Sequence, residues 1–345
     1  MKREYDFVYL TNTPSFYKLN LCNEIAKTHS LLLVLYGYGA EAVNKDLSGN
    51  NNYRFDVKFL HNGDSHKRNK LKVFFNLLSL MKSIKVKKVL YSGWLAPEYN
   101  IYSFISPKSK NVVINESTIW ESSLNGIKGW IKRCIINRMG AALPSGEPHK
   151  ELFTSINYKG RINITGGVGL LNMGIRKEHD PNTPLRYIYV GRLIELKNIS
   201  LLIETFNKNG KPLTIVGKGE LEQELKSKAK SNISFIGFVD NEKLGEIYQS
   251  HDVFILPSTY EAWGLVVEEA LYWGLPVIVS NKIGCSIDMV KRYNSGEIFQ
   301  LSENEGLEKA ISKIESNYNE FKNNVLSIDW EERTKEQVNA YTSLI

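Results

Sequence analysis

The sequence predicts an α/β protein built from two doubly wound, Rossmann-like domains. Short β-branched or aromatic runs alternate with amphipathic stretches along nearly the whole chain, as in parallel sheets covered by helices on both faces. The alternation restarts after a polar stretch at 166–184 that Gly and Pro punctuate. The length of 345 residues also favours two domains, at about 150 residues each.

The first half supplies the elements of the first domain, residues 1–165. We expect its strands at 5–10, 31–36, 54–60, 88–91, 112–115 and 141–143. We expect its helices at 16–27, 71–84, 127–137 and 148–154. The strand segments are short β-branched or aromatic runs, and the helical segments are amphipathic.

The second half repeats this pattern in residues 166–328. Its expected strands are 186–190, 212–216, 233–235, 253–256, 276–279 and 296–299. Its expected helices are 199–207, 221–228, 241–249, 266–273 and 307–318, with a last helical stretch near 331–341. Ligands of such sheets bind at the carboxyl ends of the strands, so residues that follow strands are the candidates for function.

Composition excludes several classes of protein. With 42% hydrophobic and 23% charged residues, the chain is neither disordered nor collagen-like. Cys22, Cys134 and Cys285 lie far apart without a Cys-x-x-Cys pair, which argues against a disulfide framework or a structural zinc site. The start MKREYDFVYL lacks the apolar core of a signal peptide, and no run reaches the roughly 18 apolar residues of a membrane span. We therefore expect a cytoplasmic protein.

Charge is distributed unevenly between the two halves. Residues 1–160 carry 23 basic and 12 acidic side chains, a net charge of +11, whereas residues 161–345 carry 21 and 25, a net charge of −4. Residues 65–97 hold eight Lys or Arg and no acid. An anionic partner of the first half could be nucleic acid, phospholipid or a phosphorylated substrate. Nucleic acid is disfavoured because no recognition helix, aromatic–basic platform or zinc module is evident.

One motif, PSTYEAWGLVVEEAL, follows the strand expected at 253–256. A helix beginning near Gly264 would leave the amides of Gly264, Leu265 and Val266 free to bind an anion. Glu261 would precede this helix, and Glu269 would project from it. Carboxylates beside an anion site fit a ligand with both phosphates and sugar hydroxyls, which is a nucleotide sugar.

This segment resembles the signature of the retaining GT-B glycosyltransferases of family 4 (group 1). Glu261 and Glu269 match the E-x7-E pattern, with Trp263 where Phe is commoner, and the following GLPVI also looks like that family. The resemblance implies a GT-B fold, with an acceptor domain and a donor domain facing across a cleft. It also implies that the last segment, 329–345, crosses back to the first domain.

The resemblance implies roles for four charged residues. Glu261 would hold the donor sugar as positive charge develops on it, and Glu269 would hold the ribose. Arg192 and Lys197 match a Gly-Arg…Lys pattern whose cations approach the donor diphosphate. The chain has no Asp-x-Asp motif for a divalent metal, so we expect metal-independent chemistry without a cofactor. Alternatively, Arg192 and Lys197 are solvent-exposed residues at the start of a helix and bind no ligand.

Further donor contacts are expected in the loops after three strands. Gly191 follows the first strand of the second half, and Gly217 follows the second. Phe238 and Val239 follow the third, where the resemblance implies backbone contacts to the base. Alternatively, Gly217 is a simple turn residue, and Phe238 is an aromatic residue that packs in the core or at its rim.

Candidate acceptor or sugar contacts in the first half are Thr13, Glu116 and His149, which follow its first, fifth and sixth strands. A surface histidine is the alternative for His149. The stretch 66–88 combines apolar residues with flanking lysines, which indicates a helix buried on the sheet, a surface that docks on an anionic membrane, or both.

The predicted function is transfer of a hexosyl or N-acetylhexosaminyl unit, with retention, from a UDP-sugar to a lipid-linked glycan. The setting would be assembly of bacterial surface polysaccharide, such as O-antigen, lipopolysaccharide or capsule, on the inner face of the plasma membrane. The alternatives are a GDP-sugar (mannosyl) transferase, a GT-B sugar-nucleotide epimerase or phosphorylase-like enzyme, and an inactive nucleotide-sugar-binding partner subunit.

Overall fold

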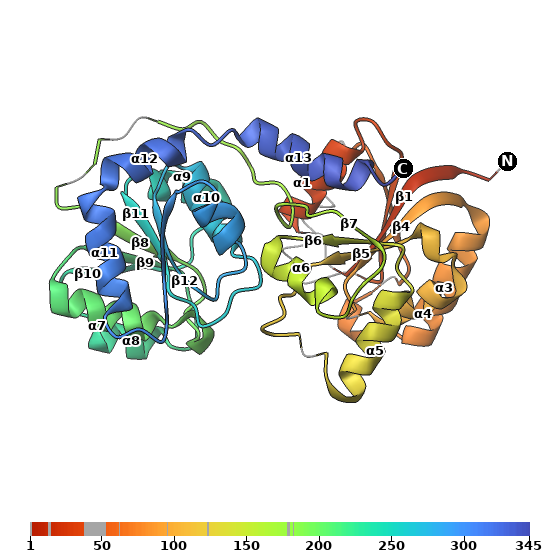
Figure 1. Cartoon of the computed structure of the whole chain (residues 1–345), viewed down its shortest axis with the longest axis horizontal. Coiled ribbons are helices and arrows are strands. Elements are labelled where there is room, and N and C mark those ends of the chain that lie inside the picture. Colours follow the sequence, from red (N-terminus) through yellow and green to blue (C-terminus); the bar gives the residue numbers. More distant parts are fainter. Residues whose placement is uncertain are drawn as a thin grey trace. The chain divides into compact units, whose positions relative to one another are not determined.

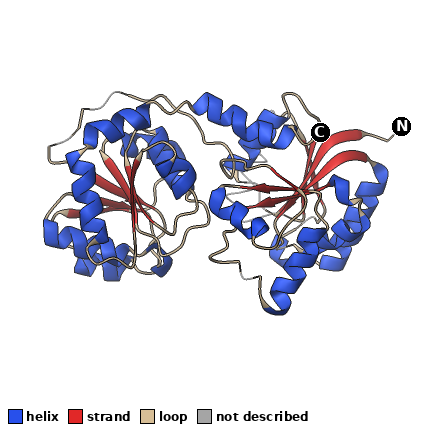
Figure 2. Cartoon of the chain, in the orientation of Figure 1, coloured by secondary structure: helices blue, strands red, loops and turns tan. Residues whose placement is uncertain are grey.

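A computed structural model gives the fold (Figures 1 and 2). Contacts divide the chain into two compact units, which are described separately. Unit 1 is Met1–Asn172 with Glu331–Ile345, and unit 2 is Met173–Trp330. The structure describes residues 2–12, 15–37, 53–61, 63–94, 96–122, 124–177, 180–181 and 183–345.

Unit 1 contains a parallel sheet of seven strands among its described residues, in the order β3-β2-β1-β4-β5-β6-β7. The strands are β1 (Glu4–Thr11), β2 (Leu31–Leu35), β3 (Asp56–Phe59), β4 (Lys85–Ser92), β5 (Asn111–Asn115), β6 (Ala141–Pro144) and β7 (Arg161–Ile162). The central strand β1 pairs with β2 on one side and with β4 on the other, with Val8 opposite Leu32 and Val89. Its burial on both faces explains its run of apolar residues.

The helices of unit 1 cover both faces of this sheet. They are α1 (Phe16–Ile25), α3 (Lys70–Ser83), α4 (Pro97–Ile105), α5 (Gly126–Asn137), α6 (Glu147–Thr154) and α13 (Trp330–Thr342). One core contains Leu77 of α3, Tyr99 of α4, Ile136 of α5 and Phe153 of α6, so these four helices lie on the same face. A second core contains α1 and, through Tyr341, α13, which therefore lie on the other face.

Unit 2 contains a parallel sheet of six strands in the order β10-β9-β8-β11-β12-β13. The strands are β8 (Tyr187–Val190), β9 (Leu213–Val216), β10 (Ile233–Ile236), β11 (Val253–Leu256), β12 (Val277–Ser280) and β13 (Gly296–Phe299). The helices are α7 (Ile199–Asn209), α8 (Glu222–Lys228), α9 (Asn241–Gln249), α10 (Leu265–Tyr272), α11 (Gly306–Ser316) and α12 (Tyr318–Leu326). Every residue of β8, β11 and β12 is buried, as expected for the centre of a covered parallel sheet.

The predicted class of two parallel α/β domains is confirmed, but some elements were not predicted. Helix α4 was missed, although Pro97 stands in its first turn, where proline favours a helix start. The helix expected at 307–318 corresponds to α11, whereas α12, which begins at Tyr318, was missed. A π-helical turn at Ser286–Lys291 was also not foreseen. Among the described residues, no helix combines the length and apolar character that a membrane span requires.

Candidate functional site

The candidate site of unit 2 lies where the order of its strands reverses. Strands β8 and β11 are neighbours at the centre of the sheet, and the chain proceeds from β8 towards β10 and from β11 towards β13. Loops that leave two such strands diverge and open a crevice at their carboxyl ends. Arg192 follows β8 and Glu261 follows β11, so the fold brings these two candidate segments to the same edge.

Lys197 and Glu261 form a close ion pair at this edge. Lys197 ends a short 3-10 helix, Glu195–Lys197, and its Nζ contacts Oε2 of Glu261. The two side chains are only 12% and 22% exposed, so solvent screens the pair weakly. The sequence placed a cation and a carboxylate in one site, and the structure brings them into direct contact.

The backbone of Glu261 is fixed by the loop that follows β12. Its amide donates to the carbonyl of Lys282 at 3.0 Å, and its carbonyl accepts from the amide of Gly284 at 3.0 Å. Glu261 also forms an isolated parallel bridge with Ile283. These contacts hold the carboxylate in place without depending on a ligand.

Gly264 immediately precedes α10, as the motif predicted. Its φ of +98° lies in the left-handed region, and a Cβ there would lie 2.9 Å from Cγ2 of Ile283. A side chain would therefore be strained and crowded at this position. The amides of Leu265 and Val266, in the first turn, have no acceptor within the helix, which makes the start of α10 suited to an anion.

The two adjacent carboxylates of α10 have different environments. Glu268 is 3% exposed and accepts the indole N–H of Trp263 at 2.8 Å, so it is a structural residue. Glu269 is half-buried and accepts the hydroxyl of Tyr248 at 3.3 Å. Burial raises the pKa of Glu269 to about 7, so this carboxyl group changes charge near neutral pH.

Glycines allow the loops after β8 and β9 to pack backbone against backbone. A Cβ on Gly217 would lie 1.9 Å from the carbonyl oxygen of Gly191, and one on Gly219 would lie 2.2 Å from that of Leu193. The amide of Leu193 in turn donates to the carbonyl of Lys218 at 2.9 Å. The close approach of two backbones therefore explains why glycine stands at 217 and 219, and it is a more specific explanation than a simple turn.

The other predicted donor residues lie at the surface of unit 2. Arg192 is exposed, and its carbonyl accepts the hydroxyl of Tyr189 at 2.9 Å. Phe238 follows β10 and is 70% exposed, so the core alternative for this aromatic ring is wrong. Val239 is half-buried. The exposed guanidinium and ring are accessible to a ligand.

The three candidates of unit 1 have different surroundings. Thr13 lies outside the described residues. Glu116, after β5, pairs with Nζ of Lys18 at 2.9 Å. Burial lowers the pKa of Lys18, but the neighbouring Glu116 outweighs that effect and raises it overall. His149 is fully buried in α6, so the surface alternative for this histidine is wrong.

Sequence reasoning missed Lys18 and Tyr248, the partners of Glu116 and Glu269. Lys18 shares one face of α1 with Cys22 and Ile25, at positions i, i+4 and i+7. A lysine on that apolar face was the available signal for a buried cation. Tyr248 offered no such signal, because only the fold brings α9 next to α10.

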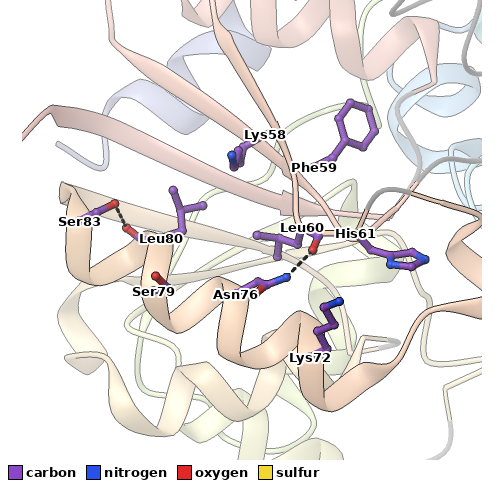
Figure 3. Close-up of a pocket in the computed structure, with 9 residues that line it drawn as sticks. All are labelled: Lys58, Phe59, Leu60, His61, Lys72, Asn76, Ser79, Leu80 and Ser83. Carbon is purple, nitrogen blue, oxygen red and sulfur yellow. Dashed lines mark hydrogen bonds between the residues drawn. The ribbon is translucent and has the colours of Figure 1, made fainter.

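A surface pocket of unit 1 contains none of the predicted site residues (Figure 3). It lies between β3 and α3 and has a volume of about 570 Å³. Its lining is Lys58, Phe59, Leu60, His61, Lys72, Asn76, Ser79, Leu80 and Ser83. In the part of the chain that the structure describes, no three His, Cys, Asp or Glu side chains gather as metal ligands would.

A comparison with protein-family models finds a match within unit 2 of the chain. Residues 174–327, all within unit 2, match the family described as "Glycosyl transferases group 1". An uncharacterised glycosyltransferase of Methanocaldococcus jannaschii is 29% identical over 171 residues, which are 45% of this chain and 44% of that protein. A GDP-mannose-dependent alpha-mannosyltransferase of Corynebacterium glutamicum is 29% identical over 129 residues, 37% of this chain and 31% of that protein. The chain thus spans less than half the length of these relatives.

Solved structures resemble the whole chain in fold. The lipopolysaccharide outer core galactosyltransferase WaaB matches with a TM-score of 0.74 and 13% identity, over 99% of this chain and 100% of that one. Anabaena HepE, solved in complex with UDP and glucose, matches with a TM-score of 0.71 and 15% identity, over 98% and 100%. The fold is therefore GT-B, as the sequence predicted.

Proposed function

We propose that this chain, whose residues 174–327 match the family described as glycosyl transferases group 1, belongs to that family and transfers a hexosyl or N-acetylhexosaminyl unit from a nucleotide diphosphate sugar. The acceptor is a hydroxyl group of a lipid-linked glycan, and the anomeric configuration is retained. The observation that carries this proposal is the cluster at the reversal of strand order in unit 2, where Lys197 meets Glu261 beside the start of α10.

The cations of this cluster stabilise the leaving nucleoside diphosphate. Negative charge grows on the distal phosphate as the glycosidic bond to the donor breaks. Arg192 and Lys197 offset that charge, and a unit charge about 4 Å away contributes roughly 4 kcal/mol at an effective dielectric constant of 20. The first amides of α10 add about 0.3–1 kcal/mol. These groups supply the countercharge that a metal supplies in other transferases, so the reaction needs no metal ion.

The remaining donor groups hold the sugar and the nucleoside. Glu261 accepts hydrogen bonds from the donor sugar and stabilises the positive charge that develops on its anomeric carbon. Glu269 holds the ribose, and Phe238 and Val239 lie beside the base. We propose a uridine nucleotide, which the UDP bound in the structurally similar HepE supports.

The chemical step is a front-face displacement. The acceptor hydroxyl oxygen forms its bond to the anomeric carbon on the face from which the phosphate oxygen departs, and that phosphate oxygen takes the hydroxyl proton. No protein general base is required. Retention follows because the bond forms on the same face on which the old bond breaks.

The acceptor binds to unit 1, where Thr13, Glu116 and His149 are the proposed contacts. The setting is assembly of bacterial surface polysaccharide, such as O-antigen or capsule, which the fold of the lipopolysaccharide enzyme WaaB supports. Such an acceptor carries a lipid, so we also propose that the protein works at the cytoplasmic face of the plasma membrane, in contact with it through residues 66–88.

A panel of nucleotides and two variants test this function. In thermal-shift measurements UDP and its sugars should stabilise the protein by roughly 2.7 kcal/mol at about 100 times Kd. Glu261→Gln should lower turnover by about 10²–10³ while keeping most of the nucleotide affinity. Arg192→Ala should weaken both. Glu246→Gln and Lys243→Ala, exposed changes on α9, are the matched controls.

Three other results would redirect the proposal. Stabilisation by GDP-sugars alone would make the donor a mannosyl-type nucleotide. Consumption of the donor without any acceptor would indicate an epimerase. Nucleotide binding without turnover in the purified chain, but with turnover after a partner transferase is added, would indicate an inactive subunit. If Glu261→Gln and Arg192→Ala both retained full activity, the assigned roles would be wrong.

A further inference from the structure

The pocket of unit 1 lies on the outer side of its sheet and contains none of the residues assigned to the transfer (Figure 3). Strand β3 is the last strand of the described sheet and forms one wall, and helix α3 forms the other. The volume of about 570 Å³ lies in the range of ligand sites, roughly 300–1,000 Å³. We call this pocket the β3–α3 groove, and its lining residues are Lys58, Phe59, Leu60, His61, Lys72, Asn76, Ser79, Leu80 and Ser83.

A polar stripe of α3 forms one wall of the groove. An ammonium group, an amide and two hydroxyl groups recur at positions i, i+4, i+7 and i+11 on one exposed face of the helix: Lys72, Asn76, Ser79 and Ser83. The stripe is about 16 Å long, because an α-helix rises 1.5 Å per residue. It therefore presents hydrogen-bonding groups at intervals to an extended ligand.

Two of these polar groups are held in place by bonds within the lining (Figure 3). Nδ2 of Asn76 donates to the carbonyl of Leu60 at 2.8 Å, and Oγ of Ser83 donates to the carbonyl of Leu80 at 2.7 Å. The first bond uses one N–H of the amide, which has an oxygen and a second N–H besides. Groups that are already oriented lose less freedom when a ligand binds.

The groove is positively charged. Among its nine described lining residues none is acidic, and three carry or can acquire a positive charge: Lys58, His61 and Lys72. The acidic residues nearest to β3 in sequence make other contacts. Asp56 pairs with Arg3 at 2.6 Å, and Asp64 accepts the amide of His66 at 2.8 Å. The groove therefore favours an anionic ligand.

The apolar part of the groove is aliphatic. Leu60 packs with the core on the α3 side of the sheet, whereas Phe59 packs with the core on the opposite side, since successive residues of a strand point to opposite faces. Figure 3 accordingly shows the ring of Phe59 directed away from α3. Hydrogen-bonding groups spread along an aliphatic floor fit the repeated hydroxyl groups of a sugar chain better than a nucleobase, which binds by stacking on aromatic rings.

The place of the groove in unit 1 relates it to the proposed acceptor site. His61 follows the carboxyl end of β3, at the edge of the sheet where Glu116 follows β5. In the order β3-β2-β1-β4-β5, four spacings of about 4.8 Å separate these strands by about 19 Å. A glycan whose growing end lies at Glu116 would reach the groove only with sugars that were added several steps earlier.

We propose that the β3–α3 groove binds an acidic segment of the acceptor glycan, remote from its growing end. The carboxylate or phosphate groups of that segment pair with Lys58 and Lys72, and its hydroxyl groups bond to Asn76, Ser79 and Ser83. The identity of the ligand as acceptor rests on the proposed transfer to a glycan, whereas the binding itself does not require transfer. The inference adds a substrate class, a sugar chain that carries acidic residues.

Calorimetric titration of the full chain with tetragalacturonate, a chain of four acidic sugars, tests this proposal. The protein should bind it at least about tenfold more tightly than neutral maltotetraose. Lys58→Gln with Lys72→Gln should weaken binding about 25-fold, at roughly fivefold for each unit charge about 4 Å away in water. Ser79→Glu should weaken it about fivefold without affecting folding, because glutamate is a good helix former at an exposed position. Lys70→Gln with Lys82→Gln removes two exposed lysines of the same helix that do not line the groove, and should weaken binding less than about twofold.

A second measurement locates the ligand. In NMR spectra the ring signals of His61, assigned with His61→Gln, should shift during the titration, while those of His251 in unit 2 stay unchanged. Absence of saturable binding would overturn the proposal, as would an equal loss in the control pair. Inorganic phosphate that binds as tightly as tetragalacturonate would show a site for charge alone. Tighter binding of hexaglutamate would make the groove a site for an acidic peptide.

These titrations contain no sugar nucleotide, so they separate this proposal from the proposed transfer. Binding of tetragalacturonate by a protein that no nucleotide sugar stabilises would leave the groove as a glycan site and would contradict the transfer. Stabilisation by UDP-sugars without binding of tetragalacturonate would overturn the groove alone.

Discussion

The two units place their candidate residues at equivalent points, the carboxyl ends of parallel strands, but hold them by different means. In unit 2 Glu261 forms a side-chain ion pair with Lys197, and backbone contacts add to it: Gly217 packs against Gly191, and the amide of Glu261 donates to the carbonyl of Lys282. In unit 1 the loop residue Glu116 is held by the side chain of Lys18. Backbone contacts demand particular residues such as glycine, whereas a side-chain pair can be built in many ways. A motif is therefore recognisable from sequence in unit 2 and not in unit 1.

The largest expected effect tests the backbone contact in unit 2. Gly217→Val places a Cβ 1.9 Å from a carbonyl oxygen at a φ of +136°, so the loops after β8 and β9 must separate. We expect a loss of more than about 4 kcal/mol in the free energy of unfolding, measured by urea denaturation. Gly210→Ala, also at positive φ but with open space around it, should cost only about 1 kcal/mol. Equal costs for the two variants would contradict the close-approach explanation.

The corresponding test in unit 1 removes a side-chain partner. Glu116→Gln leaves the ammonium of Lys18, only 9% exposed, without its carboxylate, and should destabilise the protein by about 2–4 kcal/mol. Adding Lys18→Met should restore much of that loss. Unchanged stability together with a raised KM for the acceptor would instead make Glu116 purely a ligand contact.

The pH dependence of stability tests Glu269. Burial raises its pKa in the folded protein to about 7, above the ordinary value of 4.5, so the folded state binds its proton more tightly than the unfolded state. Its contribution to stability is therefore fully present below about pH 4.5 and is lost as pH rises to about 7, by at most about 3 kcal/mol.

Glu269→Gln should flatten this part of the profile of unfolding free energy against pH. Glu246→Gln, an exposed change on α9, is the control and should retain the wild-type slope. A Glu269→Gln profile that superimposes on the wild-type profile would show that this carboxyl group is not the source of the slope.

The smallest expected effect concerns Trp263. Trp263→Phe introduces the residue that is commoner in the family pattern but removes an indole donor from the buried carboxylate of Glu268. We expect a loss of about 1–2 kcal/mol. Combining it with Glu268→Gln should give less than the sum of the two single losses, and strict additivity in this double-mutant cycle would argue against the bond.

Most of the fold was predictable because it rests on local patterns. Buried parallel strands such as β11 and β12 are continuous apolar runs, and Gly264 and Gly274 mark the two ends of the helix between them. The errors arose where local signals are ambiguous. Pro97 favours a loop and a helix start alike, and α12, a short polar helix that begins directly after Asn317, has no side-chain cap to mark its start.

The candidate site was predictable in its residue types but not in its pairings. The acid before Gly264 and the cation after Gly191 follow from motif positions, whereas the contact between Lys197 and Glu261 spans 64 residues of sequence and exists only in the folded sheet. The same holds for Tyr248 beside Glu269. Local pattern identifies the groups, and strand order determines which of them meet.

Helix α3 has a consequence for how this protein tolerates mutation. One side of the helix packs into the core through Leu77, a second lines the pocket through Asn76, and a third points outward through Phe75. Three consecutive residues thus lie in three different environments, which are the exposed surface, the pocket lining and the core. A saturation scan of this helix should consequently show a different permitted chemistry at each successive position, instead of the alternation of tolerant and intolerant sites typical of an ordinary amphipathic helix.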